Sequence, residues 1–346
     1  MAEKLPDHFG VDFGNHSVKA VELRDLSSPN PRLISFGSKA TPFGVLNSDN
    51  DIHIKRLAEV LKDLTKEANI KSKYVVIALP ESVVSTRVTT IKGVKEKELN
   101  QAVYWDTKQS IPVPIDEMEL SWMVLSEKKD EEEYLILRVA ATKKIIKTYT
   151  EIVTQAGFEP LALETEGIAI ARMVKNISKL DSVVVLDFGS QTTDMSIVKN
   201  GALAFSQSIT TGSDALTRAI MSDFSLEYSQ SEEYKRKYGL EKGQLEDKIF
   251  VSLDPVMKII VGEVVRGIEF YKSQTGFSAP KEVSLVGDGS LLPGLVLYLT
   301  EKLGVNISLS DPWKNIKVKK EDAKLLSKGK SAYAVAVGLA LRQYMI

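Results

Sequence analysis

Two carboxylates, Asp12 and Asp187, stand where a run of branched apolar residues breaks into a polar turn that contains glycine. The first turn lies in FGVDFGNHSVKAVEL, residues 9–23, and the second in VVVLDFGSQTTDMSIV, residues 183–198. A single Asp-x-Gly turn after a strand is common, because glycine tolerates positive φ and aspartate hydrogen-bonds to the backbone beyond it. Here the string DFG recurs 175 residues later, close to half of the 346-residue chain, which indicates two similar halves.

Each copy continues with a segment in which apolar and polar positions alternate, residues 17–23 and 194–198, as in a strand that returns from a hairpin. Two strand-turn-strand units whose turns face each other make a cleft lined by backbone N–H groups, hydroxyls and two carboxylates. Such a cleft suits a phosphate chain with Mg²⁺. Turn amides and hydroxyls bind the phosphate oxygens, and the carboxylates hold a magnesium ion that keeps most of its waters.

The composition narrows the classes of function. A net charge of −1, from 45 basic and 46 acidic residues, gives no overall field to attract nucleic acid, so we expect no such partner. The absence of cysteine excludes disulfides and thiolate chemistry, and the three histidines lack a metal-ligand spacing. The first ten residues hold no apolar signal segment, and the longest apolar stretches fall short of the roughly 20 residues that span a bilayer. We therefore expect a cytoplasmic protein without direct membrane insertion.

The elements that must position these residues can be sketched from periodicity. Residues 9–37 predict three strands, residues 51–69 a helix, and residues 74–80 a buried strand. Residues 82–156 then follow a βαββα order, which predicts a small α+β unit inserted into the first half. We place the first half at residues 1–183 and the second at 184–346, with a helical subdomain at about 213–282. In the second half, strand VSLV runs into the turn GDGS, residues 287–290.

Three motifs in this order resemble the actin-like ATPase superfamily: VDFGNHSVK its phosphate-1 loop, VLDFGSQTTD its phosphate-2 loop, and LVGDGSLLPGL its adenosine motif. Nearly the whole chain resembles the PilM family of type IV pilus assembly proteins, through GVDFGNHSVKAVEL, YVVIALPESVVSTRVTTI, GFEPLALETEGIAIAR and VGDGSLLPGL. The inserted unit is also similar to that of the division protein FtsA. The resemblance implies an α/β actin-like ATPase fold, with two similar α/β halves around a nucleotide cleft and a small FtsA/PilM-type α+β insertion.

The resemblance also implies roles for individual residues. Asp12 and Asp187 would hold Mg²⁺ through water beside ATP or ADP, and Lys19 would neutralise phosphate charge. The remaining expected nucleotide contacts are Gly14, Asn15, Ser17, Gly189, Ser190, Thr192 and Thr193 at the phosphates, with Gly287, Gly289, Ser290, Glu263 and Arg266 at the adenosine. Glu263 and Arg266 fit a solvated salt bridge equally well. Asp288 stands where the family commonly has a small residue, so the pocket for the base is expected to differ.

Hydrolysis needs a water oriented against the γ-phosphate, and members of the superfamily place a glutamine, glutamate or aspartate in the connector for this purpose. Glu164 and Glu166 occupy that stretch, and alternation along a strand would point both to one face. Two like charges beside phosphate would repel it, so we expect at most one of them to face the nucleotide. Without that geometry, the protein would bind ATP and turn it over slowly.

The function that the resemblance implies is a cytoplasmic ATP-binding scaffold of type IV pilus assembly. It would be recruited to the inner face of the inner membrane by the cytoplasmic N-terminal peptide of a PilN-like partner. Tyr104, Trp105 and Trp122 would contribute to a peptide groove, or they are ordinary core. The alternatives are a small-molecule kinase of the superfamily and a filament-forming FtsA-like cytoskeletal or GspL-like secretion component, and self-association and other pilus components stay open as partners. A chain that ends in ALRQYMI is expected to differ from FtsA and GspL, which continue into membrane-associated helices.

Overall fold

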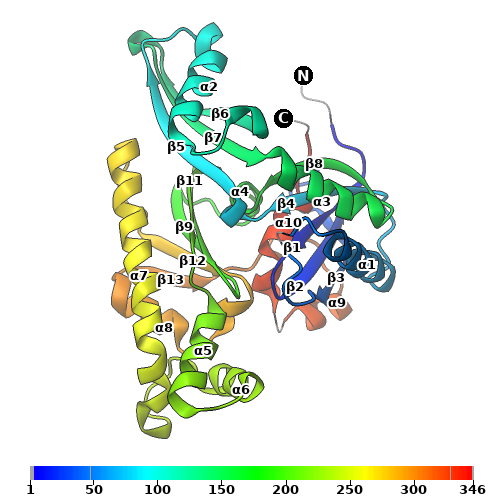
Figure 1. Cartoon of the computed structure of the whole chain (residues 1–346), viewed down its shortest axis with the longest axis vertical. Coiled ribbons are helices and arrows are strands. Elements are labelled where there is room, and N and C mark those ends of the chain that lie inside the picture. Colours follow the sequence, from blue (N-terminus) through cyan, green and yellow to red (C-terminus); the bar gives the residue numbers. More distant parts are fainter. Residues whose placement is uncertain (1–3, 47, 328, 345–346) are drawn as a thin grey trace.

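Two five-stranded sheets of the same topology form the two halves of the chain. The computed structural model describes residues 4–46, 48–327 and 329–344 (Figure 1). The first sheet has the order β3–β2–β1–β4–β8, formed by β1 (His8–Phe13), β2 (Ser17–Arg24), β3 (Arg32–Ala40), β4 (Tyr74–Leu79) and β8 (Glu159–Thr165). The second has the order β11–β10–β9–β12–β13, formed by β9 (Ser182–Phe188), β10 (Thr193–Lys199), β11 (Ala202–Ile209), β12 (Glu282–Val286) and β13 (Asn306–Leu309).

The pairing is the same in both sheets. Strands β1, β2 and β3 pair antiparallel, as do β9, β10 and β11, and the remaining strands of each sheet pair parallel. The central strands β1 and β9 are buried along nearly their whole length, as expected of strands covered by helices on both faces. This arrangement confirms the predicted α/β fold of two similar halves.

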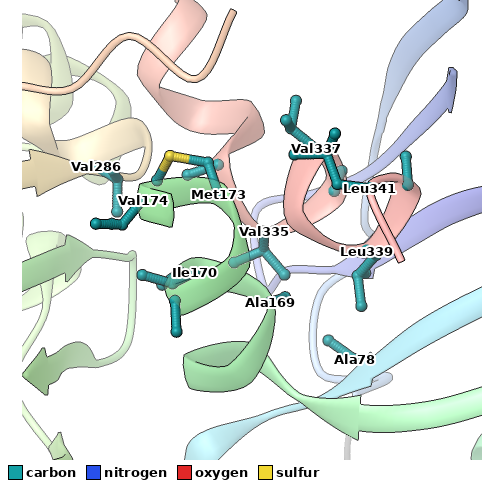
Figure 2. Packing of buried hydrophobic residues seen from close by; sticks show 14 of the residues in the cluster. Ala78, Ala169, Ile170, Met173, Val174, Val286, Val335, Val337, Leu339 and Leu341 are labelled. Carbon is teal, nitrogen blue, oxygen red and sulfur yellow. The ribbon is translucent and has the colours of Figure 1, made fainter. Parts of the chain in front are cut away.

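Helices α4 (Glu166–Ile177) and α10 (Ala334–Ala340) lie between the two sheets and share one apolar core with both of them. Figure 2 shows the side chains of the two helices packed together in this joint. A Cβ added to Gly338 of α10 would lie 2.0 Å from the carbonyl oxygen of Ala169 in α4. A Cβ on Gly10 of β1 would likewise lie 2.5 Å from the carbonyl oxygen of Ala336. Glycine at these two positions therefore lets the backbones of both halves approach closely.

The outer faces of the sheets are covered by separate helices. Helices α1 (Asp51–Glu67) and α3 (Lys143–Gln155) pack on the first sheet, whose outer core contains residues of both helices. The core on the outer face of the second sheet contains residues of α5 (Ser213–Phe224), α7 (Lys248–Thr275) and α8 (Leu295–Leu303). Helix α6 (Tyr228–Tyr238) packs on α5 and α7, and the short α9 (Lys320–Leu326) lies in the C-terminal part of the chain.

A third sheet, of order β5–β7–β6, forms the inserted unit at one end of the molecule (Figure 1). It consists of β5 (Val84–Lys92), β6 (Met118–Lys128) and β7 (Glu133–Thr142), with α2 (Leu99–Ser110) packed on one face. The sequence predicted α3 as the last element of this unit. In the structure α3 joins the first half, where the Tyr149 ring meets Phe13 of β1 edge-on, with 5.6 Å between ring centroids. The domain boundaries themselves stay predictions.

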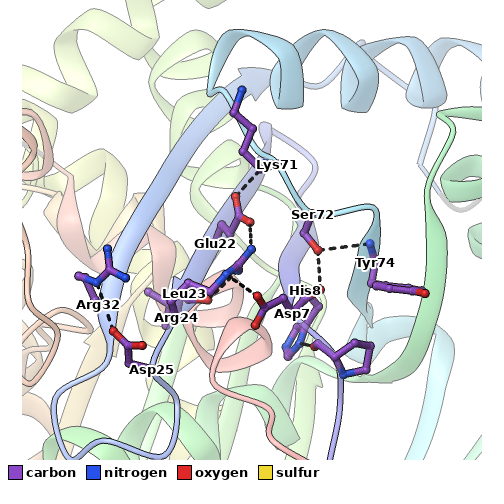
Figure 3. A network of polar contacts seen from close by, with 11 residues as sticks. Asp7, His8, Glu22, Leu23, Arg24, Asp25, Arg32, Lys71, Ser72 and Tyr74 are labelled. Carbon is purple, nitrogen blue, oxygen red and sulfur yellow. Dashed lines mark hydrogen bonds and ion pairs between the residues drawn. The ribbon is translucent and has the colours of Figure 1, made fainter.

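A buried acidic side chain fixes the edge of the first half away from the cleft (Figure 3). Glu22 of β2 is fully buried, and both of its carboxylate oxygens are bonded: Arg24 Nη2 donates at 2.6 Å and the backbone N–H of Lys71 at 3.0 Å. Arg24 also pairs with Asp7 at 2.9 Å, while the Ser72 hydroxyl donates to the Asp7 carbonyl at 2.5 Å. These bonds tie the segment before β1 and the segment before β4 to β2.

Within the described residues, no helix is both long enough and apolar enough to cross a lipid bilayer. The last two residues of the C-terminal sequence ALRQYMI, positions 345 and 346, lie outside the described part of the chain.

Candidate functional site

The turns that follow β1, β9 and β12 meet around one small pocket with a volume of ≈ 70 Å³. Most of the predicted nucleotide-site residues line it: Asp12, Gly14, Asn15, Ser17, Lys19, Asp187, Gly189, Ser190, Thr192, Gly287 and, of the two connector glutamates, Glu166. Asp194 and Asp288 line it as well. The motifs at the two halves and the turn at residues 287–290 are thus brought together from three distant parts of the sequence.

Two further predicted contacts lie just behind this lining. Thr193 is buried and its hydroxyl donates to the Thr211 carbonyl at 2.8 Å. Ser290 is also buried, and its hydroxyl donates to the Gly287 carbonyl at 2.7 Å. In the structure both hydroxyls therefore stabilise the turns of the site rather than line its pocket.

The hairpins after β1 and β9 have the same local geometry. The N–H of Gly14 donates to the Ser17 carbonyl at 3.2 Å, and the N–H of Gly189 donates to the Thr192 carbonyl at 3.0 Å. A Cβ at either glycine would lie 2.9 Å from that same carbonyl oxygen. Both turns therefore require glycine, and the repeated DFG string encodes a repeated turn.

The third turn passes close to the second hairpin. Gly287 has a φ of +86°, and a Cβ there would lie 2.3 Å from Oδ1 of Asp187. A Cβ on Gly289 would lie 2.3 Å from the Phe188 ring. No side chain fits at these two positions, so the glycines that the sequence assigned to the adenosine motif also set the position of this turn against Asp187.

The pocket is crowded with carboxylates. Burial, together with the neighbouring Asp194 and Asp12, raises the pKa of Asp187 to about 8. Burial also raises the pKa of Asp12 to about 6, against the opposing effect of Lys19, and the pKa of Asp194 to about 6. Burial and these three aspartates raise the pKa of Glu166 well above its usual range. The site therefore favours a cation, and an anionic ligand needs a cation with it.

These residues fit magnesium held through water. Among the described residues there is no group of three or more acidic or histidine side chains placed to hold a metal ion directly. Asp12 and Asp187 lie in the same pocket, and the Asp12 charge contributes to the raised pKa of Asp187. A divalent cation between the two carboxylates would remove that repulsion. A magnesium ion that retains its waters and binds phosphate oxygens suits such a site.

A salt bridge crosses the pocket from one half to the other. Nζ of Lys19, on β2, lies 2.8 Å from Oδ2 of Asp288, in the turn after β12. Lys19 is buried; burial alone would lower its pKa, but Asp288 and Asp12 raise it overall, so the lysine stays charged. Among the described residues, Lys19 carries the one ammonium group of the pocket lining. This group is paired with Asp288, the residue that departs from the family pattern.

The two connector glutamates point in different directions. Strand β8 ends at Thr165 and α4 begins at Glu166, so the alternation predicted for a continuous strand does not extend to Glu166. Glu166 lines the pocket and accepts a hydrogen bond from the backbone N–H of Glu81 at 3.1 Å. Glu164 is buried elsewhere, with Arg172 Nη1 at 2.6 Å and Arg342 also bonded to its carboxylate. Of the two candidates for the catalytic carboxylate, Glu166 thus lines the pocket, and Glu164 lies outside it, held by two arginines. The catalytic role itself stays a prediction.

Glu263 and Arg266 form an ion pair with each other on α7. Gln207 of β11 donates to Glu263 at 3.3 Å, and Arg266 is exposed. Neither residue lines the pocket, so the structure favours the solvated salt bridge over the adenosine contact.

Sequence reasoning missed two buried charged residues beside the site. The carboxylate of Glu81 accepts from the N–H of Gly167 at 2.9 Å and from the Thr86 hydroxyl at 3.2 Å, which links α4 to β5. Lys235 of α6 donates to the Ser213 hydroxyl at 2.6 Å and to the Thr217 hydroxyl at 2.8 Å. It thereby fixes the first turn of α5, next to the second hairpin. Both residues look like ordinary surface charges in the sequence, since their partners are distant.

Two halves of one topology, with matching glycine hairpins and a third glycine turn around an acidic pocket, define the actin-like ATPase fold. The chain belongs to the family "Type IV pilus assembly protein PilM", whose family model matches residues 10–344. Both findings confirm the resemblance seen in the sequence.

Several solved structures share the fold of this chain. A PilM-PilN type IV pilus biogenesis complex has a chain 29% identical to this one, with a TM-score of 0.85 over 97% of this chain and 98% of that chain. Ethanolamine utilization protein EutJ from Carboxydothermus hydrogenoformans is 15% identical, with a TM-score of 0.59 over 99% and 92% of the chains. MreB5 of Spiroplasma citri bound to ADP is 14% identical, with a TM-score of 0.54 over 96% and 94%.

A curated relative matches only part of the chain. Ethanolamine utilization protein EutJ of Escherichia coli (strain K12) is 27% identical over 118 residues, which are 34% of this chain and 38% of that protein.

Proposed function

We propose that the protein is a cytoplasmic ATP-binding scaffold of type IV pilus assembly that binds the N-terminal peptide of a PilN-like inner-membrane protein in a nucleotide-dependent way. The observation that supports it best is the meeting of three glycine turns and two aspartates in one pocket, in a chain that belongs to the PilM family. Recruitment to the inner face of the inner membrane would follow from binding the tethered partner.

The residues of the pocket have distinct proposed roles toward Mg-ATP. Bound magnesium supplies the positive charge that lets a triphosphate enter an acidic site. Asp12 and Asp187 hold its waters, and the backbone N–H groups of the Gly14 and Gly189 turns bind phosphate oxygens. Glu166 is the connector carboxylate that would orient a water, and it does so only when ionised, which its raised pKa opposes. We therefore expect slow hydrolysis, well below the roughly 10 s⁻¹ of a median enzyme.

Nucleotide entry requires the site to open. The pocket has a volume of ≈ 70 Å³, and binding pockets for organic ligands are usually several times larger. The Lys19–Asp288 salt bridge spans the two halves at this point. We propose that Lys19 exchanges Asp288 for phosphate as the halves separate, so nucleotide binding changes their relative position.

The partner peptide is proposed to bind the inserted unit. The solved PilM-PilN complex provides a precedent in a chain of the same fold. In this protein β6 is an edge strand of the third sheet, and Met123 and Val124 on it are exposed, as is Trp105 on α2. An extended peptide can pair with such an edge through its backbone and bury apolar anchors against these side chains. Trp122 is less available, because it is half-buried and its indole N–H donates to Asn100 at 3.1 Å.

Isothermal titration of the protein with the cytoplasmic N-terminal peptide of its PilN-like partner tests this proposal, with and without Mg-ATP. We expect binding in both conditions, with different affinities. The Trp105→Ala and Val124→Lys variants should each bind the peptide more weakly than wild type. Phe43→Ala removes a 95% exposed aromatic ring from the loop before α1 and should bind the peptide as wild type does. Absence of peptide binding by the wild type would refute the scaffold function; equal affinities for wild type and the two variants would refute only the docking surface.

A further inference from the structure

A second and larger pocket, of ≈ 490 Å³, lies where the inserted unit meets the second half. Its walls come from β5 and β7 and the end of α2 on one side, and from β11 and α7 on the other. None of the residues that line the small pocket between the hairpins belongs to it. Its size is within the usual range for sites that bind small organic molecules.

One wall of this pocket contains a buried guanidinium with a free donor. Arg138 of β7 is 1% exposed. Its Nη2 donates to the Ser110 hydroxyl, and its Nε lies 3.2 Å from Oδ2 of Asp106. Among the described residues, Nη1 has no hydrogen-bond partner. A buried donor left unpaired is costly, which makes this atom the natural contact for a bound acceptor.

A second arginine strengthens the positive charge. Arg87 of β5 is the direct cross-strand partner of Arg138, so both side chains lie on the same face of the sheet, and both line the pocket. Burial lowers the pKa of Arg138, and the Arg87 charge lowers it further while Asp106 opposes both effects. Arg138 pairs with one carboxylate, Asp106, whose side chain is 32% exposed, and Arg87 adds a second positive charge on the same face of the sheet. The pair has one positive charge in excess, and an anion would remove the repulsion.

The opposite wall offers an apolar surface and amide groups. Phe270 and Tyr271 of α7 line the pocket, and Phe270 is 47% exposed. Gln207 of β11 lines the same wall, and its side-chain amide can bond to a polar substituent. Aromatic rings pack on a flat organic body, and paired arginines bind carboxylate or phosphate oxygens in a planar fork.

We propose that this pocket binds a small organic oxoanion, a carboxylate or phosphate carried on an aromatic or similarly flat body. Its anionic group contacts Arg87 and Arg138, and its body packs on Phe270. Because the two walls belong to the inserted unit and to the second half, such a ligand holds these two parts together.

Ligand-observed NMR titrations of the protein test the proposal with three small aromatic probes: benzoate, phenyl phosphate and benzyl alcohol. We expect both anions to bind in the millimolar range and benzyl alcohol to bind about tenfold more weakly. The anion that binds with the higher affinity indicates whether the natural ligand carries a carboxylate or a phosphate. Failure of both anions to bind would overturn the proposal.

Three variants locate the site. Arg87→Gln removes an exposed charge and should lower the affinity for both anions about tenfold without disturbing the fold. Arg138→Gln should do the same, with thermal unfolding used to confirm that it is folded. Lys92→Gln, at the end of the same strand, removes an equal charge outside the pocket and should leave binding unchanged. Equal losses in Arg87→Gln and Lys92→Gln, or unchanged binding in both Arg87→Gln and Arg138→Gln, would place the anions elsewhere and refute the site.

Discussion

Replacing Asp187 by asparagine is expected to stabilise the ligand-free protein while removing its response to nucleotide. Asp187 is surrounded by Asp12, Asp194 and Glu166 in the pocket. Asparagine has nearly the same shape as aspartate but carries no charge at any pH. The Asp187→Asn variant therefore removes the repulsion and leaves the packing in place.

The size of the effect follows from the pKa of this group. Burial raises the pKa of Asp187 from 3.8 to about 8. Each pH unit between these values is worth about 1.4 kcal/mol, so ionised Asp187 destabilises the fold by up to about 5 kcal/mol at pH 8. In this window the folded chain holds a proton that the unfolded chain has released, so wild-type stability falls as the pH rises. The advantage of the variant should be near zero at about pH 4 and grow towards pH 8.

Urea unfolding of both proteins at several pH values between 5 and 8, in buffer with a chelator and no nucleotide, measures this difference. The exposed Asp181→Asn variant, just before β9, is the matched control and should show no such trend. A parallel thermal titration with Mg-ATP should show a rise in melting temperature for wild type and little or none for Asp187→Asn. A variant that is less stable than wild type at pH 8, or an advantage that does not change with pH, would refute the reasoning.

Three further substitutions separate binding from stability. Asp288→Gly releases Lys19 and removes one negative charge from the pocket lining, so fluorescence titration should show Mg-ATP binding about tenfold tighter. Unchanged or weaker binding would contradict the exchange of Asp288 for phosphate. Glu164→Gln leaves its arginine partners without an anion and should destabilise the fold by about 3 kcal/mol in urea unfolding, with nucleotide affinity unchanged. A loss of nucleotide affinity with unchanged stability would instead assign Glu164 to the nucleotide site. Gly338→Ala places a Cβ 2.0 Å from the carbonyl oxygen of Ala169, and should cost about 2 kcal/mol in the same assay; a neutral effect would show that α10 shifts freely.

Local signals in the sequence were sufficient to predict the parts of the site that depend on backbone conformation. Gly14 and Gly189 sit in turns that exclude a side chain, and a turn of this kind is encoded within a few residues. The repeat of one such turn at half the chain length also predicted the two halves. The strands on either side of each turn alternate or are fully apolar, so their existence and order were readable as well.

The remaining features depend on partners far away in the sequence. Glu164 is bonded to Arg342, 178 positions later, and no local sequence pattern predicts this contact. Lys19 meets Asp288 across 269 positions, so a lysine expected to bind phosphate is paired with a carboxylate instead. Helix α3 follows the inserted strands in sequence, but its apolar face packs against the first sheet and α1. Periodicity identifies the buried face of a helix but not the surface that covers it.

The hydrogen bonds made by Glu81 connect the hairpin pocket with the inserted sheet. Its N–H is bonded to Glu166, and its carboxylate to Gly167 at the start of α4 and to Thr86 near the start of β5. A ligand that moves Glu166 therefore acts on the first strand of the inserted sheet. If the pocket binds nucleotide and this sheet binds the partner peptide, as we propose, linkage requires that the peptide change nucleotide affinity by the same factor by which nucleotide changes peptide affinity. The doubly loaded complex has one free energy whichever ligand arrives first, so a substitution that weakens this connection would lower the two mutual effects by the same factor.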